Sequence, residues 1–389
     1  MTTLRGITWD HARGYEPVRA ASEEFRRLRP DIRIEWEKRS LKDFGDYPVD
    51  VLAREYDLLM IDHPHVGISS AQGALAPLDL YLPADFLADQ AAHAVGPSHR
   101  SYEWNGHQWA LAVDAAAQVA SYRPDLIGQE ELPCSWAEVE ALARSLPPGR
   151  RVGWPLCPTD AMCSFLTLCA GSGGDAFFSE TDGIPRRTGE AALERMLRLL
   201  PLLHESSLAS NPIQMYDRMA EEDDIVYVPL AFGYSNYARS GFAGKLLRFA
   251  DIPGEDGRPR GALLGGVGIA VSASSSDIPS AVEFVRFLAG GELQRTLYAR
   301  HEGQPGHGSA WRDAEVNRYT HGFFADTYAT LAASYLRPRH AAFPAFQERA
   351  GALLHEALVR FRQGKGADRS QLIADMNRLY ATVRKETLV

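Results

Sequence analysis

Several features that would assign a chain to a specialised class are missing from this sequence. No run of about 18 apolar residues occurs, so the sequence predicts no membrane-spanning helix. Basic residues are outnumbered, with 41 Lys and Arg against 50 Asp and Glu, and the formal net charge is -9. Nucleic acid is bound by basic faces that meet its phosphates, so we expect no nucleic-acid partner.

The start of the chain lacks the pattern of a secretory signal. Such a signal has a basic start, about 7–15 apolar residues and a small-residue cleavage site, and none of these opens the sequence. The first apolar run is typical of a strand instead. The expectation is therefore either a mature fragment with a new Met or a protein that stays in the cytosol.

Cysteine is scarce and badly spaced for metal binding. The chain has four cysteines: Cys134, Cys157, Cys163 and Cys169. Zinc sites usually contain a close Cys-x(2–4)-Cys pair, which is absent here. The last three lie six residues apart, which turns a helix by roughly 600° and gives them no common face. We therefore expect free, buried thiols and neither a metal nor a cofactor.

The familiar motifs of nucleophilic and phosphate chemistry are also missing. The sequence contains no Gly-x-Ser-x-Gly elbow and no Gly-x(4)-Gly-Lys-Ser/Thr loop. The stretch 265–268 is rich in glycine, but Ala270 and Val271 continue it as a strand and no helix opens there. The pattern indicates a strand that passes close to other backbone, not a dinucleotide site.

Strand-like and helix-like segments alternate along the chain. Its 389 residues are too many for one ordinary domain, and 45% hydrophobic with 23% charged residues is a globular composition. Alternation of strands and helices predicts an α/β fold with a mostly parallel sheet. Strands are expected at 4–8, 31–36, 56–62, 109–122, 225–229 and 265–272, and helices at 15–28, 48–54, 190–204, 278–299, 323–336, 346–362 and 370–384. Ser135 with Glu138 predicts a capping box, and 171–174 a glycine-rich loop.

Acidic and imidazole side chains gather where strands are expected to end. They are Asp10, His11, Asp62, His63, His65 and Asp114. In parallel sheets ligands lie beyond the carboxyl ends of the strands. Such groups can bind a metal, transfer protons, cap a helix, satisfy a polar core or bond a ligand hydroxyl. No His-Glu-x-x-His motif supports the metal alternative, so we expect hydrogen bonds to a ligand.

Aromatic residues occupy loop-like positions beside glycines and strand ends. Sugar sites combine aromatic platforms for C–H faces with polar groups for hydroxyls. The alternative for each ring is packing in the core. The segment 232–237 is the strongest candidate because Gly233 and Asn236 break both helix and strand patterns. The set is Trp9, Phe232, Tyr234, Tyr237, Trp311, Phe343 and Phe346, with Asn236 among them.

A Gly-Gln-Pro-Gly turn at 303–306 follows the strand at 265–272 and the helix at 278–299. It indicates a backbone bent to meet another part of the molecule. We expect its Gln304 to lie near the ligand site.

Five segments together resemble family 1 extracellular solute-binding proteins, the maltose-binding class that serves carbohydrate ABC importers. The first segment is Tyr-Asp followed by apolar residues at 56–62, together with Gly-x-Leu-x-Pro-Leu-Asp at 73–79, and the second is 111–114 together with 121–126. The third is the helix start Pro-x-Ser-Trp-x-Glu at 133–138, the fourth is the strand at 265–272, and the fifth is the turn at 303–306. Each is weak alone, but their order covers nearly the whole chain.

The resemblance implies two α/β lobes, 1–111 plus 266–316 and 113–263 plus 317–389, with a ligand cleft between them. It implies capture of a small polar ligand by hinge closure, delivery to an ABC permease, a monomer, no enzymatic activity and export to the periplasm. Arg13, Arg337 and Arg339 could meet an anionic ligand, so a sugar acid stands beside a neutral sugar. The alternative is a cytosolic relative that uses its Asp and His residues as an enzyme or ligand sensor.

Overall fold

The computed structural model describes residues 1–40, 48–174 and 176–387, which form two compact units. Unit 1 contains Met1–Ala116, Gly265–Thr320 and Arg339–Ala341, and unit 2 contains Ala117–Leu264, His321–Pro338 and Ala342–Val389. The expected lobes place residues 339–341 with the second lobe, whereas their contacts lie in unit 1. Two strands, β6 (Leu111–Tyr122) and β10 (Leu264–Val271), carry the chain from one unit into the other.

Unit 1 is built on a mixed sheet in the order β2-β1-β3-β10, with the first part of β6 beside β10. Strand β1 is parallel to β2 and to β3, and β10 runs antiparallel to β3. The expected mostly parallel sheet is therefore only partly right. The strands of this sheet include β1 (Thr2–Trp9), β2 (Ile32–Arg39) and β3 (Leu58–Ile61). A separate antiparallel pair is formed by β4 (Glu103–Trp104) and β5 (His107–Gln108).

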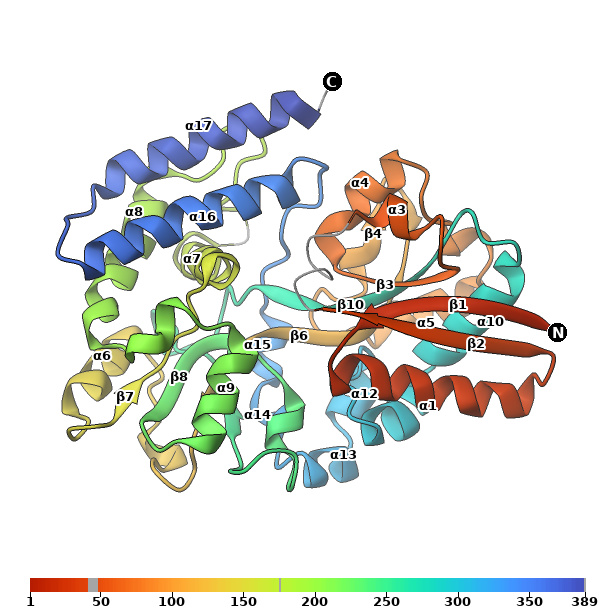
Figure 1. Cartoon of the computed structure of the whole chain (residues 1–389), viewed down its shortest axis with the longest axis horizontal. Helices are drawn as coiled ribbons and strands as arrows, with labels where there is room; N and C mark the ends of the chain where they lie inside the picture. Colours follow the sequence, from red (N-terminus) through yellow and green to blue (C-terminus); the bar gives the residue numbers. More distant parts are fainter. Residues whose placement is uncertain (41–47, 175, 388–389) are drawn as a thin grey trace. The chain divides into compact units, whose positions relative to one another are not determined.

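Helices cover both faces of this sheet, because alternate strand residues point to opposite sides. Leu58 and Met60 pack in a core with α1 and α10, whereas Leu59 and Ile61 pack in a second core with α3 and α4 (Figure 1). The described residues of unit 1 form the helices α1 (Ala12–Leu28), α3 (Val49–Leu52), α4 (Val66–Ala71), α5 (Ala84–Ala92), α10 (Ile278–Ala289), α11 (Gly291–Leu293), α12 (Gly308–Trp311) and α13 (Ala314–Tyr319).

Unit 2 pairs the second part of β6 with β8 and β9, both antiparallel, and β8 with β7 in parallel. Its long helices pack on one another, with α16 against α7 and α17 (Figure 1). The elements are β7 (Arg151–Val152), β8 (Ile225–Phe232), β9 (Arg248–Ala250), α6 (Trp136–Ser145), α7 (Pro158–Gly173), α8 (Arg186–Leu199), α9 (Pro212–Glu221), α14 (Phe323–Asp326), α15 (Tyr328–Ala332), α16 (Phe343–Arg362) and α17 (Arg369–Thr387).

The Gly-Gln-Pro-Gly turn lies directly against β6 within unit 1. The carbonyl of Gln304 accepts from the Ala115 amide at 3.0 Å, and the Gly306 amide donates to Val113 O at 3.0 Å. A Cβ on Gly306 would lie 2.1 Å from the carbonyl oxygen of Ala112, so only glycine allows this approach. The predicted bent backbone is confirmed, and the partner it meets is a strand of the same unit.

Several expected elements differ from the structure. The helix expected at 278–299 breaks at Gly290, after which α11 leads into a π-helical turn, Gln294–Tyr298. The helix expected at 323–336 is two short helices, and the loop expected at 171–174 is mostly the last turn of α7. The capping box of Ser135 and Glu138 is confirmed.

The four thiols are free, as expected, but only Cys163 and Cys169 are buried, while Cys134 is exposed. Among the residues that the structure describes, no helix combines the length and apolar character needed to cross a membrane.

Candidate functional site

Four side chains after β1 and β3 form the accessible part of the predicted site. Asp10, His11, Asp62 and His65, here called the edge cluster, all keep some exposed surface. Because β1 and β3 are parallel, with Ile7 opposite Leu59, their carboxyl ends meet at one edge of the sheet. Asp10 and Asp62 therefore leave neighbouring strands at the same level.

Asp10 already has a cationic partner. The Nζ of Lys38 lies 2.7 Å from its carboxylate, with side chains 43% and 60% exposed. Lys38 comes from β2, which is parallel to β1 and extends to Arg39. Lys38 was not expected at this edge, because the strand expected from the sequence stops at residue 36. The longer strand brings the lysine to the same edge, so the edge cluster carries both signs of charge.

His11 is the N-cap of α1, and its Nδ1 accepts from the Arg13 amide at 3.1 Å. Burial, and then the positive charge of Arg13, lower the pKa of His11 to about 4. The imidazole is thus neutral at neutral pH. With Nδ1 accepting, the proton of the neutral ring lies on Nε2, which makes that atom a hydrogen-bond donor.

The segment after β3 turns at once into a short 3-10 helix, His63–His65, and then into α4. Asp62 Oδ1 lies 3.1 Å from Nδ1 of His63. The ring of His63 is fully buried and meets Tyr102 edge to face, with centroids 6.4 Å apart. His63 therefore belongs to the interior of unit 1, whereas Asp62 and His65 reach its surface.

Arg13 and Asp114 form a buried ion pair inside unit 1. Nε of Arg13 donates to Oδ2 of Asp114 at 2.7 Å, and a second guanidinium nitrogen donates to Oδ1. The side chains are 5% and 0% exposed. Burial raises the pKa of the Asp114 carboxyl, while the Arg13 guanidinium opposes that rise. The fork of Arg13, considered for an anionic ligand, is thus engaged by a carboxylate of the protein.

The other two arginines considered for an anionic ligand also have protein partners. Arg337, in unit 2, is 5% exposed and donates to Oε1 of Gln347 at 3.2 Å. Arg339, in unit 1, donates to the carbonyl of Arg100 at 2.7 Å and to that of Glu103, and lies over the ring of Trp104. Each guanidinium stabilises its own unit.

Gln304 is turned toward the backbone of β6. It is 1% exposed, and its Nε2 donates to the Ala115 carbonyl at 2.9 Å. Together with the bond from the Ala115 amide to the Gln304 carbonyl, this bond joins the turn to both backbone polar groups of Ala115. The structure therefore gives Gln304 a clear role in holding the turn.

The aromatic segment after β8 is packed inside unit 2. Tyr234, Asn236 and Tyr237 are buried, and Phe232 keeps partial exposure. The hydroxyl of Tyr237 donates to Oδ1 of Asp217 at 2.5 Å, and burial with this bond raises the pKa of Tyr237. Phe232 is thus the accessible aromatic residue of this segment.

The remaining aromatic candidates are core residues. Trp9 is 3% exposed, and Trp311 donates from Nε1 to the Pro305 carbonyl at 2.7 Å. Phe343 and Phe346 are fully buried and pack on Phe178. Sequence alone could not separate these packed rings from accessible ones.

The structure therefore divides the predicted site residues into two groups. The edge cluster and Phe232 keep surface available to a ligand, and the others serve their own unit. A ligand role for any of them stays a prediction.

The chain belongs to the bacterial extracellular solute-binding proteins, because the model of that family matches residues 8–295. Residues 8–295 include the edge cluster, Asp114 and Phe232. The family resemblance inferred from the five segments is confirmed.

Solved structures show the same α/β, two-lobe fold class. A solute-binding protein of Agrobacterium radiobacter K84 in complex with ribitol matches with TM-score 0.81 and 17% identity, covering 99% of this chain and 98% of that one. Maltose-bound MalE3 of T. maritima matches with TM-score 0.79 and 19% identity, covering 98% and 99%. A solute-binding protein of Agrobacterium vitis S4 with bound D-mannitol matches with TM-score 0.77 and 16% identity, covering 99% and 98%. The expected fold class is confirmed, and the comparisons give no support to the alternative of an enzyme or sensor.

Proposed function

We propose that this protein captures a small, neutral carbohydrate or polyol by closure of its two units and delivers it to an ABC permease as a monomer. Membership of the solute-binding family carries the proposal. The relatives of similar fold that hold maltose, ribitol and D-mannitol support this class of ligand. The edge cluster and Phe232 are the proposed contacts.

The chemistry of the edge cluster suits hydroxyl groups. The carboxylates of Asp10 and Asp62 accept hydrogen bonds, and Lys38 and the neutral His11 donate them. A sugar or polyol hydroxyl both donates and accepts, so it can satisfy groups of either kind. Phe232, half-buried at the end of β8, offers an apolar face for C–H groups.

A neutral ligand is favoured over a sugar acid. The guanidinium groups of Arg13, Arg337 and Arg339 each donate to an acceptor within their own unit. An acid that recruited Arg13 would have to displace a buried carboxylate, and separating a buried pair is costly. The accessible acids, Asp10 and Asp62, would also repel a ligand carboxylate.

A thermal-shift screen followed by calorimetric titration tests this proposal. The panel contains maltose, ribitol, D-mannitol and other neutral sugars and polyols, with gluconate and glucuronate as the acids. A ligand that binds only the folded state stabilises that state by about 2.7 kcal/mol at 100 times its Kd, and so raises the melting temperature. We expect a neutral compound to do so. No response to any compound, or tighter binding of an acid, would contradict the proposal.

Asp62→Asn tests the proposed contact once a ligand is known. The amide keeps the size of the side chain but loses the charge-assisted acceptor, which is worth about 1.5–3 kcal/mol, so affinity should fall about tenfold or more. Asp31→Asn is the matched control, because Asp31 is 61% exposed and precedes the opposite, amino end of β2. Equal affinity in Asp62→Asn and the wild type would remove Asp62 from the site.

Binding without turnover is the second part of the proposal. Ligand recovered after prolonged incubation should be chemically unchanged by mass spectrometry. If the wild type converts the ligand and His11→Ala does not, this part of the proposal is contradicted. The proposed capture of the ligand would still stand. Light scattering at several protein concentrations tests whether the protein is a monomer.

A further inference from the structure

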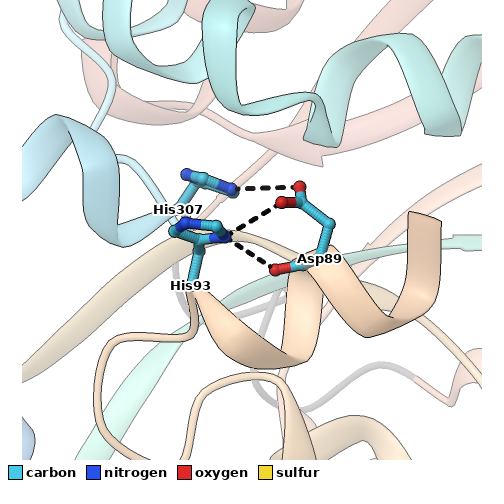
Figure 2. A group of neighbouring side chains, drawn as sticks. All are labelled: Asp89, His93 and His307. Carbon is cyan, nitrogen blue, oxygen red and sulfur yellow. Dashed lines mark hydrogen bonds and ion pairs between the residues drawn. The ribbon is translucent and has the colours of Figure 1, made fainter. Parts of the chain in front are cut away.

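Three side chains in unit 1, none of which belongs to the edge cluster, converge on one another. Figure 2 shows Asp89, His93 and His307 with their polar atoms facing one another. Nδ1 of His93 lies 3.0 Å from Oδ1 of Asp89, and Nε2 of His307 lies 3.5 Å from Oδ2 of Asp89. One nitrogen or oxygen atom from each of the three lies within 4.8 Å of the others. The two imidazole rings are stacked, with centroids 4.7 Å apart.

The local fold explains this convergence. Asp89 and His93 are four residues apart at the end of α5, so both lie on one face of the helix. His307 follows the Gly-Gln-Pro-Gly turn, far away in the sequence. A bridge joins Ala94 to His307, and the Gly308 amide donates to the His93 carbonyl at 2.7 Å. Backbone bonds therefore hold the two segments together.

The imidazole of His307 provides a second observation. Its side chain is 6% exposed, and within the described part of the chain its Nε2 makes no hydrogen bond, with Oδ2 of Asp89 lying 3.5 Å away. Nδ1 lies 2.8 Å from Oγ of Ser309 and accepts from the Ser309 amide as an N-cap. A buried polar atom without a hydrogen bond is costly, and this one points at two other ligand-type side chains.

We propose that Asp89, His93 and His307 bind a divalent transition-metal ion of the zinc type. Two imidazoles and a carboxylate suit Zn²⁺, with water in the fourth position, and imidazole disfavours Ca²⁺ and Mg²⁺. Ligand atoms of a tetrahedral zinc ion lie about 3.3 Å apart, given bonds of about 2.0–2.2 Å. The distances of 3.0 and 3.5 Å fall on either side of that value.

Small movements complete the site. The side chains of Asp89 and His93 are 48% and 46% exposed, so both can turn toward the ion. With the ion on Nε2 of His307, the ring proton moves to Nδ1 and is donated to Oγ of Ser309, in place of the bond that Nδ1 accepts from the Ser309 amide. The ion would tie α5 to the segment that follows the turn.

Calorimetric titration of zinc chloride into metal-free protein without a polyhistidine tag tests the proposal. We expect one Zn²⁺ per chain and a higher melting temperature with zinc. His93→Ala removes an exposed ligand and should weaken zinc binding more than about 100-fold. Mutation of a residue that only hydrogen-bonds to a metal ligand already lowers metal affinity about 10–100-fold. His307→Asn removes Nε2 but keeps a side-chain acceptor for the N-cap, and should lose zinc similarly.

His107→Ala is the matched control. His107 also pairs with a carboxylate, Asp79, at 2.9 Å and is 40% exposed, but among the residues that the structure describes it belongs to no group of three potential metal ligands. This variant should bind zinc like the wild type. Absence of zinc binding by the wild type, or zinc binding by His93→Ala with unchanged affinity, would overturn the proposal. Magnesium chloride should give no response, and a response equal to that of zinc would overturn the assignment to a transition metal.

Discussion

Two aspartates that follow or lie within strands of unit 1 both pair with a cation, yet in opposite surroundings. Asp10 meets Lys38 at the surface, with side chains 60% and 43% exposed. Asp114 meets Arg13 in the interior, with side chains 0% and 5% exposed. The same pairing therefore leaves one carboxylate available to a ligand and commits the other to the stability of the unit. Position near a strand end does not decide between these outcomes, whereas burial and partners do.

The largest expected effect comes from breaking the buried pair. Asp114→Ala leaves the Arg13 guanidinium buried without its partner, which should cost about 3–5 kcal/mol of unfolding free energy. Urea unfolding followed by circular dichroism measures this.

Asp10→Ala is the control for that experiment, because an exposed pair contributes about 0–1 kcal/mol. Equal losses in the two variants would break the comparison between the surface pair and the buried pair.

Tyr237→Phe extends the comparison to unit 2. The Tyr237 hydroxyl donates to Oδ1 of Asp217 at 2.5 Å and is shielded from water. Removal of a hydrogen bond to a charged group should cost about 1.5–3 kcal/mol. If the ring is structural, ligand affinity stays unchanged while the urea midpoint falls.

Tyr81→Phe is the matched control, since the side chain of Tyr81 is 46% exposed. Its urea midpoint should not move. A loss of ligand affinity in Tyr237→Phe at unchanged stability would show instead that this hydroxyl meets the ligand.

His11 is less exposed than the surface pair and less buried than the interior pair, and its titration should make the stability of the protein depend on pH. Its pKa is lowered to about 4 in the folded protein, against about 6.5 in an unfolded chain. Between these values the unfolded chain binds a proton that the folded protein does not, so stability falls as pH falls. The expected loss from pH 7 to pH 5 is about 2 kcal/mol.

His11→Asn is the control variant, because asparagine keeps a capping side chain at the start of α1 but does not titrate. The difference in urea-unfolding free energy between pH 7 and pH 5 should shrink in this variant by the part that His11 contributes. An unchanged difference would show that other groups cause it.

Local patterns predicted much of the fold, because they depend on near neighbours. Short apolar runs located β1 and β3, alternation of apolar and polar residues located β2, and Ser135 with Glu138 located the start of α6. The local patterns did not predict helix ends that depend on tertiary contacts. One example is Gly290, where α10 ends although apolar residues continue along the sequence. The direction of β10 against β3 also depends on the long connection between them, which no local pattern encodes.

The candidate site could be predicted only in part. Residue type and strand-end position correctly brought Asp10 and Asp62 to one edge of the sheet. They could not reveal that Arg13 reaches Asp114, about a hundred positions away, or that Tyr237 reaches Asp217. The cluster of Asp89, His93 and His307 shows the same limit, since only the spacing of its first two members is visible in the sequence.

The Gly-Gln-Pro-Gly turn has a practical consequence for protein engineering. Its composition suggests a permissive place to insert a reporter or an epitope, but residues 303–308 are buried and bonded to β6 and to His93. An insertion there would separate those bonds and disturb the strand that links the two units. Gly364, Lys365 and Gly366 are exposed and lie between α16 and α17, so that connection is the better place to open the chain.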